Sequence, residues 1–282
     1  MRQEHDLLGY RDVPDEAYYG VQTLRCTENF NITGVHLSAY QGFIKALAMV
    51  KQAAAQANYE LGLLDKPMAE AIIAACKEII AGKLHEQFPV DMIQGGAGTS
   101  TNMNANEVIA NRALELLGHK KGEYQFCHPN NHINLAQSTN DAYPTAGKLG
   151  ICLHTEGLIT ELENLIASFR KKGKEFGGHI KMGRTQLQDA VPMTLGQEFE
   201  SYAASLEGEV PHIRQAVSGL LEINMGATAI GTGINSDPAY ADLVTKRLAE
   251  ISGYPVKKAA NLIAATNDTS CFVSYSGQLK RL

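Results

Sequence analysis

The chain has no tryptophan, and only 7% of its 282 residues are aromatic and 20% are charged. Its 25 Lys and Arg residues against 30 Asp and Glu residues give a formal net charge of −5, so it lacks the basic surplus on which nucleic-acid binding depends. No stretch approaches roughly 18 consecutive apolar residues, so we expect no membrane span. The 44% hydrophobic content is typical of a globular protein and excludes a collagen-like or disordered chain.

The five cysteines show neither disulfide nor metal-ligand spacing, because they are scattered along the chain and no Cys-x-x-Cys pair occurs. The first six residues carry charges of both signs, and no apolar run follows them, so they do not have the pattern of a signal peptide. We therefore expect reduced thiols and a cytoplasmic protein. The cysteines are Cys26, Cys76, Cys127, Cys152 and Cys271.

Helical patterns dominate the sequence. An alanine-rich segment is followed by a segment that starts at Pro67, in which Ile72, Cys76 and Ile79 share one helix face. Nothing alternates with a period of two for long, so we expect a mostly α fold. The predicted helices cover residues 43–59, 67–80, 107–117, 144–176, 195–220 and 240–251, and a last one runs from about residue 264 to the end.

Residues 195–220 carry the clearest pattern, because apolar residues from Leu195 to Leu220 follow one another at steps of three or four. This heptad-like seam is typical of helices in bundles and of subunit interfaces. Pro211 lies inside the seam, where a proline costs about 3 kcal/mol, so we expect a kink or a packing compensation there.

Four polar segments rich in Gly, Ser, Thr and Asn each lie next to a long predicted helix. Such residues are also the ordinary capping and turn residues, which is the simplest explanation for any one segment. Helix N-termini favour anions, however, and the repetition of the pattern favours a shared anion-binding cleft. The segments are residues 95–104, 128–141, 183–189 and 226–233.

Other motifs that could explain these polar residues do not match the sequence. The glycine cluster at 95–98 lacks the Gly-Lys-Ser/Thr ending of a P-loop and the glycine spacing of a dinucleotide-binding turn. His119, His128 and His132 lie near one another in the sequence, but two of them fall in a loop-like polar context, so we expect no metal site. Cys127 precedes His128 directly, and we interpret it as a small buried residue rather than a reactive thiol.

Three long segments, Gly-Gly-Ala-Gly-Thr-Ser-Thr-Asn-Met-Asn at 95–104, Ser-Thr-Asn-Asp at 138–141 and Lys-Met-Gly-Arg-Thr-Gln-Leu-Gln-Asp-Ala-Val-Pro at 181–192, occur in this order. They resemble successive segments of the aspartase/fumarase superfamily, and the resemblance covers essentially the whole chain. It implies an N-terminal helical domain over residues 1–135 and an incomplete long-helix bundle over residues 136–282. Tyr18-Tyr19-Gly20 and Gln186 resemble the aspartate ammonia-lyase branch, since class II fumarases usually carry a tryptophan and a histidine at these places.

The resemblance implies a reversible anti-elimination of ammonia from L-aspartate, which gives fumarate through an aci-carboxylate intermediate. Clustered neutral donors suit this chemistry, because preorganised dipoles stabilise negative charge as it develops. No organic cofactor is implied; some relatives are activated by divalent cations, but no ligand set here demands one. The substrate-binding residues implied are Thr99, Ser138, Thr139, Asn140, Thr185 and Gln186, with His128 and Asn130 at a secondary carboxylate site and Arg25 as a weaker candidate for carboxylate recognition.

The family's mobile signature loop, Gly-Ser-Ser followed by Met-Pro and Lys-x-Asn-Pro, supplies the serine base and a carboxylate-binding lysine. No such sequence occurs in these 282 residues, so the resemblance ends before that loop, as in a chain truncated at its C-terminus. Two other interpretations therefore stay open: a class II fumarase-type hydratase, and a catalytically silent fragment that only assembles with other chains. Relatives that act on argininosuccinate or adenylosuccinate fit the segments less well. The family is tetrameric with active sites shared between subunits, and the seam at 195–220 fits such an interface.

Overall fold

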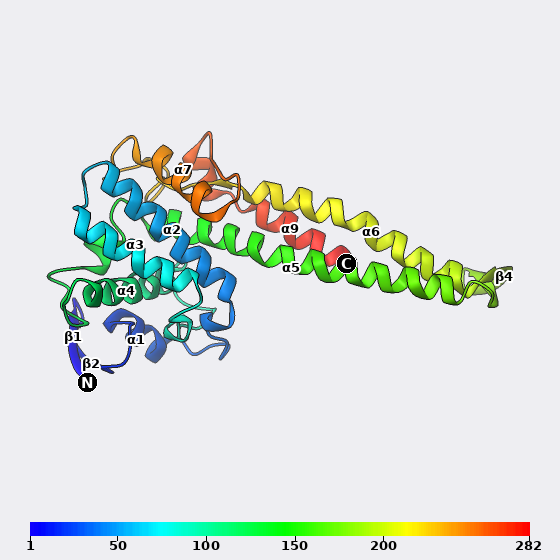
Figure 1. Ribbon diagram of the computed structural model, residues 1–282, viewed down its shortest axis with the longest axis horizontal. Coiled ribbons are helices and arrows are strands. Elements are labelled where there is room, and N and C mark those ends of the chain that lie inside the picture. Colours follow the sequence, from blue (N-terminus) through cyan, green and yellow to red (C-terminus); the bar gives the residue numbers. More distant parts are fainter. The chain divides into compact units, whose positions relative to one another are not determined.

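The computed structural model describes all residues from 1 to 282, and its secondary structure is mostly helical (Figure 1). The chain divides into two compact units, which are described in turn. The first comprises Met1–Ile151 and Leu221–Thr269, and the second comprises Cys152–Leu220 and Ser270–Leu282. These units differ from the predicted ranges 1–135 and 136–282, since each unit is built from two separate stretches of chain. None of the helices combines the length and the apolar composition that crossing a bilayer requires.

Four helices form the centre of the first unit. Helix α2 (Gln41–Glu60) packs against α3 (Lys66–Ile80) and α7 (Tyr240–Ser252), and α3 also packs against α4 (Thr99–Leu116) (Figure 1). Alanines fill much of the surface of α2, which lets its neighbours approach closely. Asp65 caps α3, since its side chain accepts a hydrogen bond from the amide of Met68 at 2.9 Å. The predicted helices over 43–59, 67–80 and 240–251 are thereby confirmed.

Three predicted helix boundaries are wrong. Helix α4 begins at Thr99 rather than at residue 107, so residues 99–104 of the polar segment 95–104 are helical. Helix α5 (Thr139–Glu175) begins five residues before Pro144 and contains this proline. The single helix expected from residue 264 is instead two helices, α8 (Leu262–Asn267) and α9 (Ser270–Arg281). In the first two cases residues that favour caps and turns lie inside a helix, because tertiary contacts outweigh their weak local preference.

Short strands are present that the sequence pattern did not predict, because none is longer than seven residues and most face solvent on both sides. They form three two-stranded sheets, of which two are antiparallel hairpins and one is parallel. Short helical turns complete the first unit: η1 (Leu37–Ala39), η2 (His85–Gln87) and the π-helical turn η3 (Pro129–Ile133). The strands are β1 (Arg2–Asp6), β2 (Gly9–Val13), β3 (Ile180–Thr185), β4 (Gln188–Thr194), β5 (Glu222–Ile223) and β6 (Lys257–Lys258).

The polar segment 183–189, expected as a loop, is the end of the hairpin β3–β4. Thr185 pairs with Gln188, so the turn consists of Gln186 and Leu187 alone. Both residues have positive φ, 51° and 66°, which a two-residue type I′ turn requires. Neither is glycine or asparagine, so the turn holds side chains in a backbone region that they rarely adopt.

Helix α1 (Val21–Asn29) is held at its N-terminus by a carboxylate from α4. Glu107 accepts hydrogen bonds from the backbone amides of Gly20, Gln22 and Thr23 at 2.8 to 3.0 Å. Gly20 must be glycine here, since a Cβ on it would lie 2.4 Å from the Tyr124 hydroxyl and 2.9 Å from the Glu107 side chain. The close approach is what brings the orphan amides of α1 within reach of Glu107.

In the second unit the rest of α5 runs beside α6 (Leu195–Leu220) and α9 (Figure 1). The Phe169 ring of α5 lies 5.6 Å from the ring of Tyr202 on α6, and Thr155 of α5 hydrogen bonds to Tyr275 of α9 at 2.6 Å. The predicted helix over 195–220 is confirmed, and it is one continuous helix that contains Pro211.

Candidate functional site

The residues that precede and begin α5 form a capped helix start. The Ser138 hydroxyl accepts a hydrogen bond from the amide of Asn140 at 3.1 Å, and Asp141 accepts one from the amide of Ser138 at 3.0 Å. This reciprocal arrangement is a capping box. Ser138 and Thr139 are half-buried and Asn140 is exposed. The three predicted residues therefore lie together at a helix N-terminus, where the backbone dipole favours an anion.

Helix α4 begins beside this helix start. Asn102 in the first turn of α4 donates to the Thr139 hydroxyl at 3.2 Å. Gly98, which precedes α4, adopts a positive φ of 87° directly against the Tyr143 ring, and a Cβ there would lie 2.4 Å from that ring. Thr99 is exposed at the first position of α4. Two helix N-termini with hydroxyl side chains are thus adjacent, as the polar segments led us to expect.

Asn140 is oriented by the loop that follows β5. Its side-chain Nδ2 donates to the carbonyl of Ala229 at 2.8 Å, and its own backbone carbonyl accepts from Asn224 Nδ2 at 3.0 Å. With one N–H of the amide nitrogen engaged, the amide oxygen and the second N–H are the groups that Asn140 can offer to a ligand. An oxygen acceptor suits an ammonium group better than a carboxylate.

A buried polar network lies beneath the helix start. Lys51 of α2 is fully buried, and its Nζ donates to Asn134 Oδ1 and Gln137 Oε1, each at 2.9 Å. Asn102 also donates to Asn134 Oδ1, at 3.1 Å. Burial lowers the pKa of Lys51 to about 7 and raises the pKa of the buried Asp141 to about 7. We did not predict Lys51 or Asp141; the available signals were a lysine among the apolar residues of a helical segment and an acidic residue three positions after Ser138.

His128 and Asn130 lie together, as expected for one site. His128 Nδ1 accepts hydrogen bonds from the amides of Asn130 and Asn131 at 3.0 and 3.3 Å and so caps η3. Burial lowers the pKa of His128, and the neighbouring His132 lowers it further. A neutral ring is the form that can accept these two bonds, so His128 offers a ligand only its second nitrogen.

Arg25 already has a carboxylate partner. Its Nε and Nη2 donate to the two carboxylate oxygens of Asp6 at 2.9 and 3.0 Å, and Nη2 also donates to the carbonyl of Gly9 at 2.8 Å. This fork geometry leaves little of the guanidinium for a substrate carboxylate. In this structure Arg25 joins α1 to the β1–β2 hairpin.

Thr185 and Gln186 are exposed at the turn of the β3–β4 hairpin. They belong to the second unit, whereas the other predicted site residues belong to the first. The structure therefore assembles Thr99, Ser138, Thr139 and Asn140 within one unit and presents Thr185 and Gln186 on another.

The described residues hold no group of three or more His, Cys, Asp or Glu side chains that could bind a metal ion. All five cysteines are unpaired. Cys127 is fully buried, as predicted, and burial raises its pKa to about 12, so it is not a reactive thiolate.

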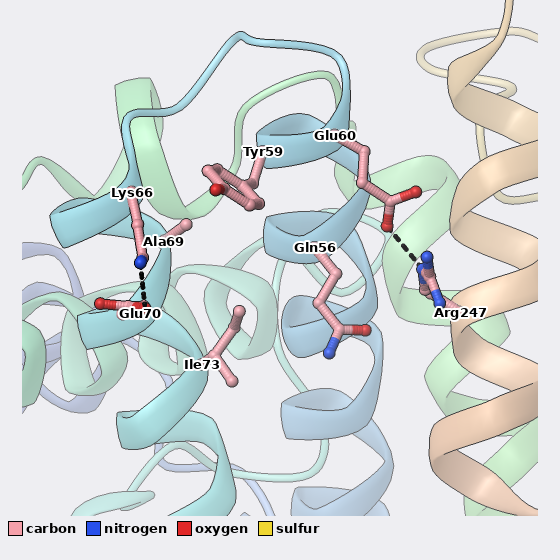
Figure 2. A pocket seen from close by; sticks show the side chains of 8 residues that line it. All are labelled: Gln56, Tyr59, Glu60, Lys66, Ala69, Glu70, Ile73 and Arg247. Carbon is pink, nitrogen blue, oxygen red and sulfur yellow. Dashed lines mark hydrogen bonds and ion pairs between the residues drawn. The ribbon is translucent and has the colours of Figure 1, made fainter.

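An open pocket of about 510 Å³ lies on α2, α3 and α7, away from all the predicted site residues (Figure 2). Its charged groups are paired with one another: Arg247 with Glu60 at 2.5 Å, and Lys66 with Glu70 at 3.8 Å. These pairs leave no unmatched charge for a ligand. The pocket is lined by Gln56, Tyr59, Glu60, Lys66, Ala69, Glu70, Ile73 and Arg247.

A family model described as Lyase matches residues 9–282. The chain belongs to this lyase family. Its solved relatives have the same fold, which confirms the predicted mostly α, aspartase/fumarase-like architecture. The fumarate lyase:delta crystallin from Brucella melitensis bound to cobalt superposes with a TM-score of 0.97 at 54% identity, over 99% of this chain and 61% of that one. The class II fumarase from Schistosoma mansoni has a TM-score of 0.91 at 36% identity, over 99% and 62%.

Among curated relatives of this lyase-family chain, the aspartate ammonia-lyase of Pseudomonas aeruginosa is 60% identical over 281 residues, which are 99% of this chain and 59% of the relative. The aspartate ammonia-lyases of Helicobacter pylori and Escherichia coli are 56% and 53% identical over the whole of this chain and 60% and 59% of their own length. The chain thus spans about three fifths of the length of these relatives.

Proposed function

We propose that this chain provides the dicarboxylate-binding part of an aspartate ammonia-lyase, a carbon–nitrogen lyase that converts L-aspartate reversibly to fumarate and ammonia. The observation that carries the proposal is the pair of adjacent helix starts at Thr99 and Ser138–Asn140, in a chain 53–60% identical to curated aspartate ammonia-lyases. Two adjacent helix N-termini that carry hydroxyl side chains suit the carboxylates of a small diacid.

In the proposed reaction a base removes the β-proton of L-aspartate, and the electron pair enters the neighbouring carboxylate to give an aci-carboxylate. The pair then forms the carbon–carbon double bond as the carbon–nitrogen bond breaks. Thr99, Ser138 and Thr139 would hold the carboxylates, because fixed neutral donors stabilise the developing charge without reorganising. Asn140 would offer its amide oxygen to the ammonium group. The serine base implied by the resemblance belongs to a motif that is not among these residues.

The proposal also covers the other predicted site residues, the assembly of the protein and its cofactor requirement. Thr185 and Gln186 would complete the pocket, and His128 with Asn130 would form a secondary carboxylate site. We propose a cytoplasmic homotetramer with sites shared between subunits, which fits the separation of the predicted residues between two units and the half-exposed apolar seam of α6. We propose that no organic cofactor takes part, because donors on the chain itself suit the reaction.

The test is fumarate formation, followed by ultraviolet absorbance, with L-aspartate and L-malate in parallel and size-exclusion chromatography of the same sample. Turnover of L-aspartate alone supports the ammonia-lyase, and it would show that a residue of this chain acts as the base. Turnover of L-malate alone would favour the fumarase-type hydratase, to which the similarity with a class II fumarase points. A folded, assembled sample that neither turns over nor binds fumarate would contradict the proposal and favour a chain that only assembles.

A further inference from the structure

One buried carboxylate joins the two loops that meet at the start of α5. Asp141 is fully buried, and its Oδ1 accepts from the amide of Ser138 at 3.0 Å while its Oδ2 accepts from the amide of Thr228 at 2.8 Å. Thr228 has a positive φ of 56°, which is unfavourable for a β-branched residue. The hydrogen bond to Asp141 therefore holds a backbone conformation that Thr228 would not keep without support.

The peptide between Gln137 and Ser138 is held on both sides. Asp141 accepts from its N–H, and Asn134 Nδ2 donates to its carbonyl at 3.1 Å. Asn134 is in turn anchored by the ammonium group of Lys51 at 2.9 Å. Because both polar groups of this peptide are engaged, the direction in which Ser138 projects its side chain is set.

Asn140 is held from the same loop as Thr228. Pro144 has no N–H, so the carbonyl of Asn140 lacks its usual partner four residues ahead and accepts from Asn224 Nδ2 instead. The Asn140 side chain donates to Ala229, the neighbour of Thr228. The position of the loop at Thr228 and Ala229 thereby determines where the Asn140 amide oxygen lies.

We propose that Asp141 is a positioning residue of the dicarboxylate site, which ties the Ser138–Asn140 turn to the Thr228 loop so that their ligand groups keep one arrangement. This inference rests on the proposed function. Asp141 itself does not contact the ligand, because it is buried and both oxygens are engaged by backbone amides. A carboxylate that served only helix capping would affect stability and leave ligand affinity unchanged.

The test compares Asp141→Asn with Glu107→Gln in the 282-residue chain. Both variants replace a buried carboxylate that accepts backbone N–H bonds by the amide of the same size, but Glu107 holds α1 rather than the candidate site. Fumarate binding is measured by isothermal titration calorimetry, and folding by circular dichroism. Ser138→Ala and the double variant of Asp141→Asn with Ser138→Ala complete a double-mutant cycle.

We expect Asp141→Asn to bind fumarate about tenfold more weakly, as for loss of one buried hydrogen-bond acceptor, and Glu107→Gln to stay within about twofold of the parent chain. Because Asp141 acts partly through Ser138, the loss of affinity in the double variant should be smaller than the product of the two single losses. Unchanged affinity in a folded Asp141→Asn chain, or single losses that multiply in the double variant, would overturn the inference.

Hydrogen exchange separates this inference from the proposed function. If the parent chain binds no fumarate, the proposed function fails, and the positioning role is decided by the amides of Ser138 and Thr228. They should exchange faster in Asp141→Asn and at the parent rate in Glu107→Gln; equal rates in all three chains refute the role. If Asp141→Asn does not fold, Asp141→Ser replaces it, because the shorter side chain cannot accept from both the Ser138 and the Thr228 amides, and the same outcomes decide.

Discussion

Helices α2 and α6 both carry a clear apolar pattern, yet the structure covers them very differently. Thirteen of the 20 residues of α2 are buried, whereas only Gly196, Ala203, Ile213 and Leu220 are buried among the 26 residues of α6. Tyr202, one of the apolar residues of the α6 seam, is 45% exposed. Apolar periodicity thus identifies the face of a helix that packs against a partner. It does not show whether that partner belongs to the same chain or to another one.

The largest expected effect is in α2. Leu47 is fully buried, so Leu47→Ala removes buried methyl groups and leaves a cavity, which costs about 2–5 kcal/mol of unfolding free energy. Urea denaturation followed by circular dichroism measures this loss. A change below about 1 kcal/mol would mean that the centre of the first unit is looser than this structure shows.

Glu107→Gln tests how the first unit tolerates a buried charge. Burial raises the pKa of Glu107 from 4.5 to about 7, so the native state holds this proton more tightly than the unfolded state does. Its contribution to stability is therefore full below about pH 4.5 and is lost as the pH rises towards 7. Glutamine cannot ionise and is a poorer acceptor, so at pH 5 the variant should be less stable by about 1–3 kcal/mol. At pH 8 this difference should shrink or reverse, because only the parent must bury an ionised Glu107.

Chemical denaturation of both proteins at pH 5 and pH 8 provides the comparison. Asp141 has a similarly raised pKa and is present in both proteins, so the unfolding free energy of the variant should still depend on pH, although less than that of the parent. Parallel slopes for the two proteins would show that Glu107 is not the titrating group.

A smaller effect is expected in the α6 seam. Leu206 is half-buried, so Leu206→Ala should cost about 1 kcal/mol or less in a single chain. If other copies cover the seam, as proposed, Leu206→Asp should shift the protein to a smaller species in size-exclusion chromatography. An unchanged elution volume for Leu206→Asp would argue against an interface at the seam and sharpen the contrast with α2.

The smallest effect concerns the turn of the β3–β4 hairpin. Leu187 is 95% exposed with a φ of 66°, so its side chain adds strain without burial. Leu187→Gly should stabilise the protein by about 0.5 kcal/mol, since relief of strain exceeds the entropy that glycine loses. Leu187→Ala is the control, because alanine keeps the strain. Equal melting temperatures for the glycine and alanine variants would contradict this explanation.

Part of the candidate site could be predicted because its residues are neighbours in the sequence. Ser138, Thr139 and Asn140 form a consecutive capping segment, and Thr99 follows a glycine cluster that precedes a helix. Lys51 and Asp141 could not be assigned in this way, since their importance comes from burial beside residues far away in the sequence. The strands were missed because pairs of short, exposed strands leave no periodic pattern.

The amino-acid sequence by itself determined where most helices lie, which residues are polar caps and to which superfamily the chain is similar, because these features depend on local spacing. Only the tertiary structure decided that the starts of α4 and α5 are adjacent, that Arg25 is occupied by Asp6, and that Asp141 joins Ser138 to Thr228. Such contacts connect residues up to 87 positions apart. Local preferences are too weak to encode them, and burial of the first unit's helices brings the partners together.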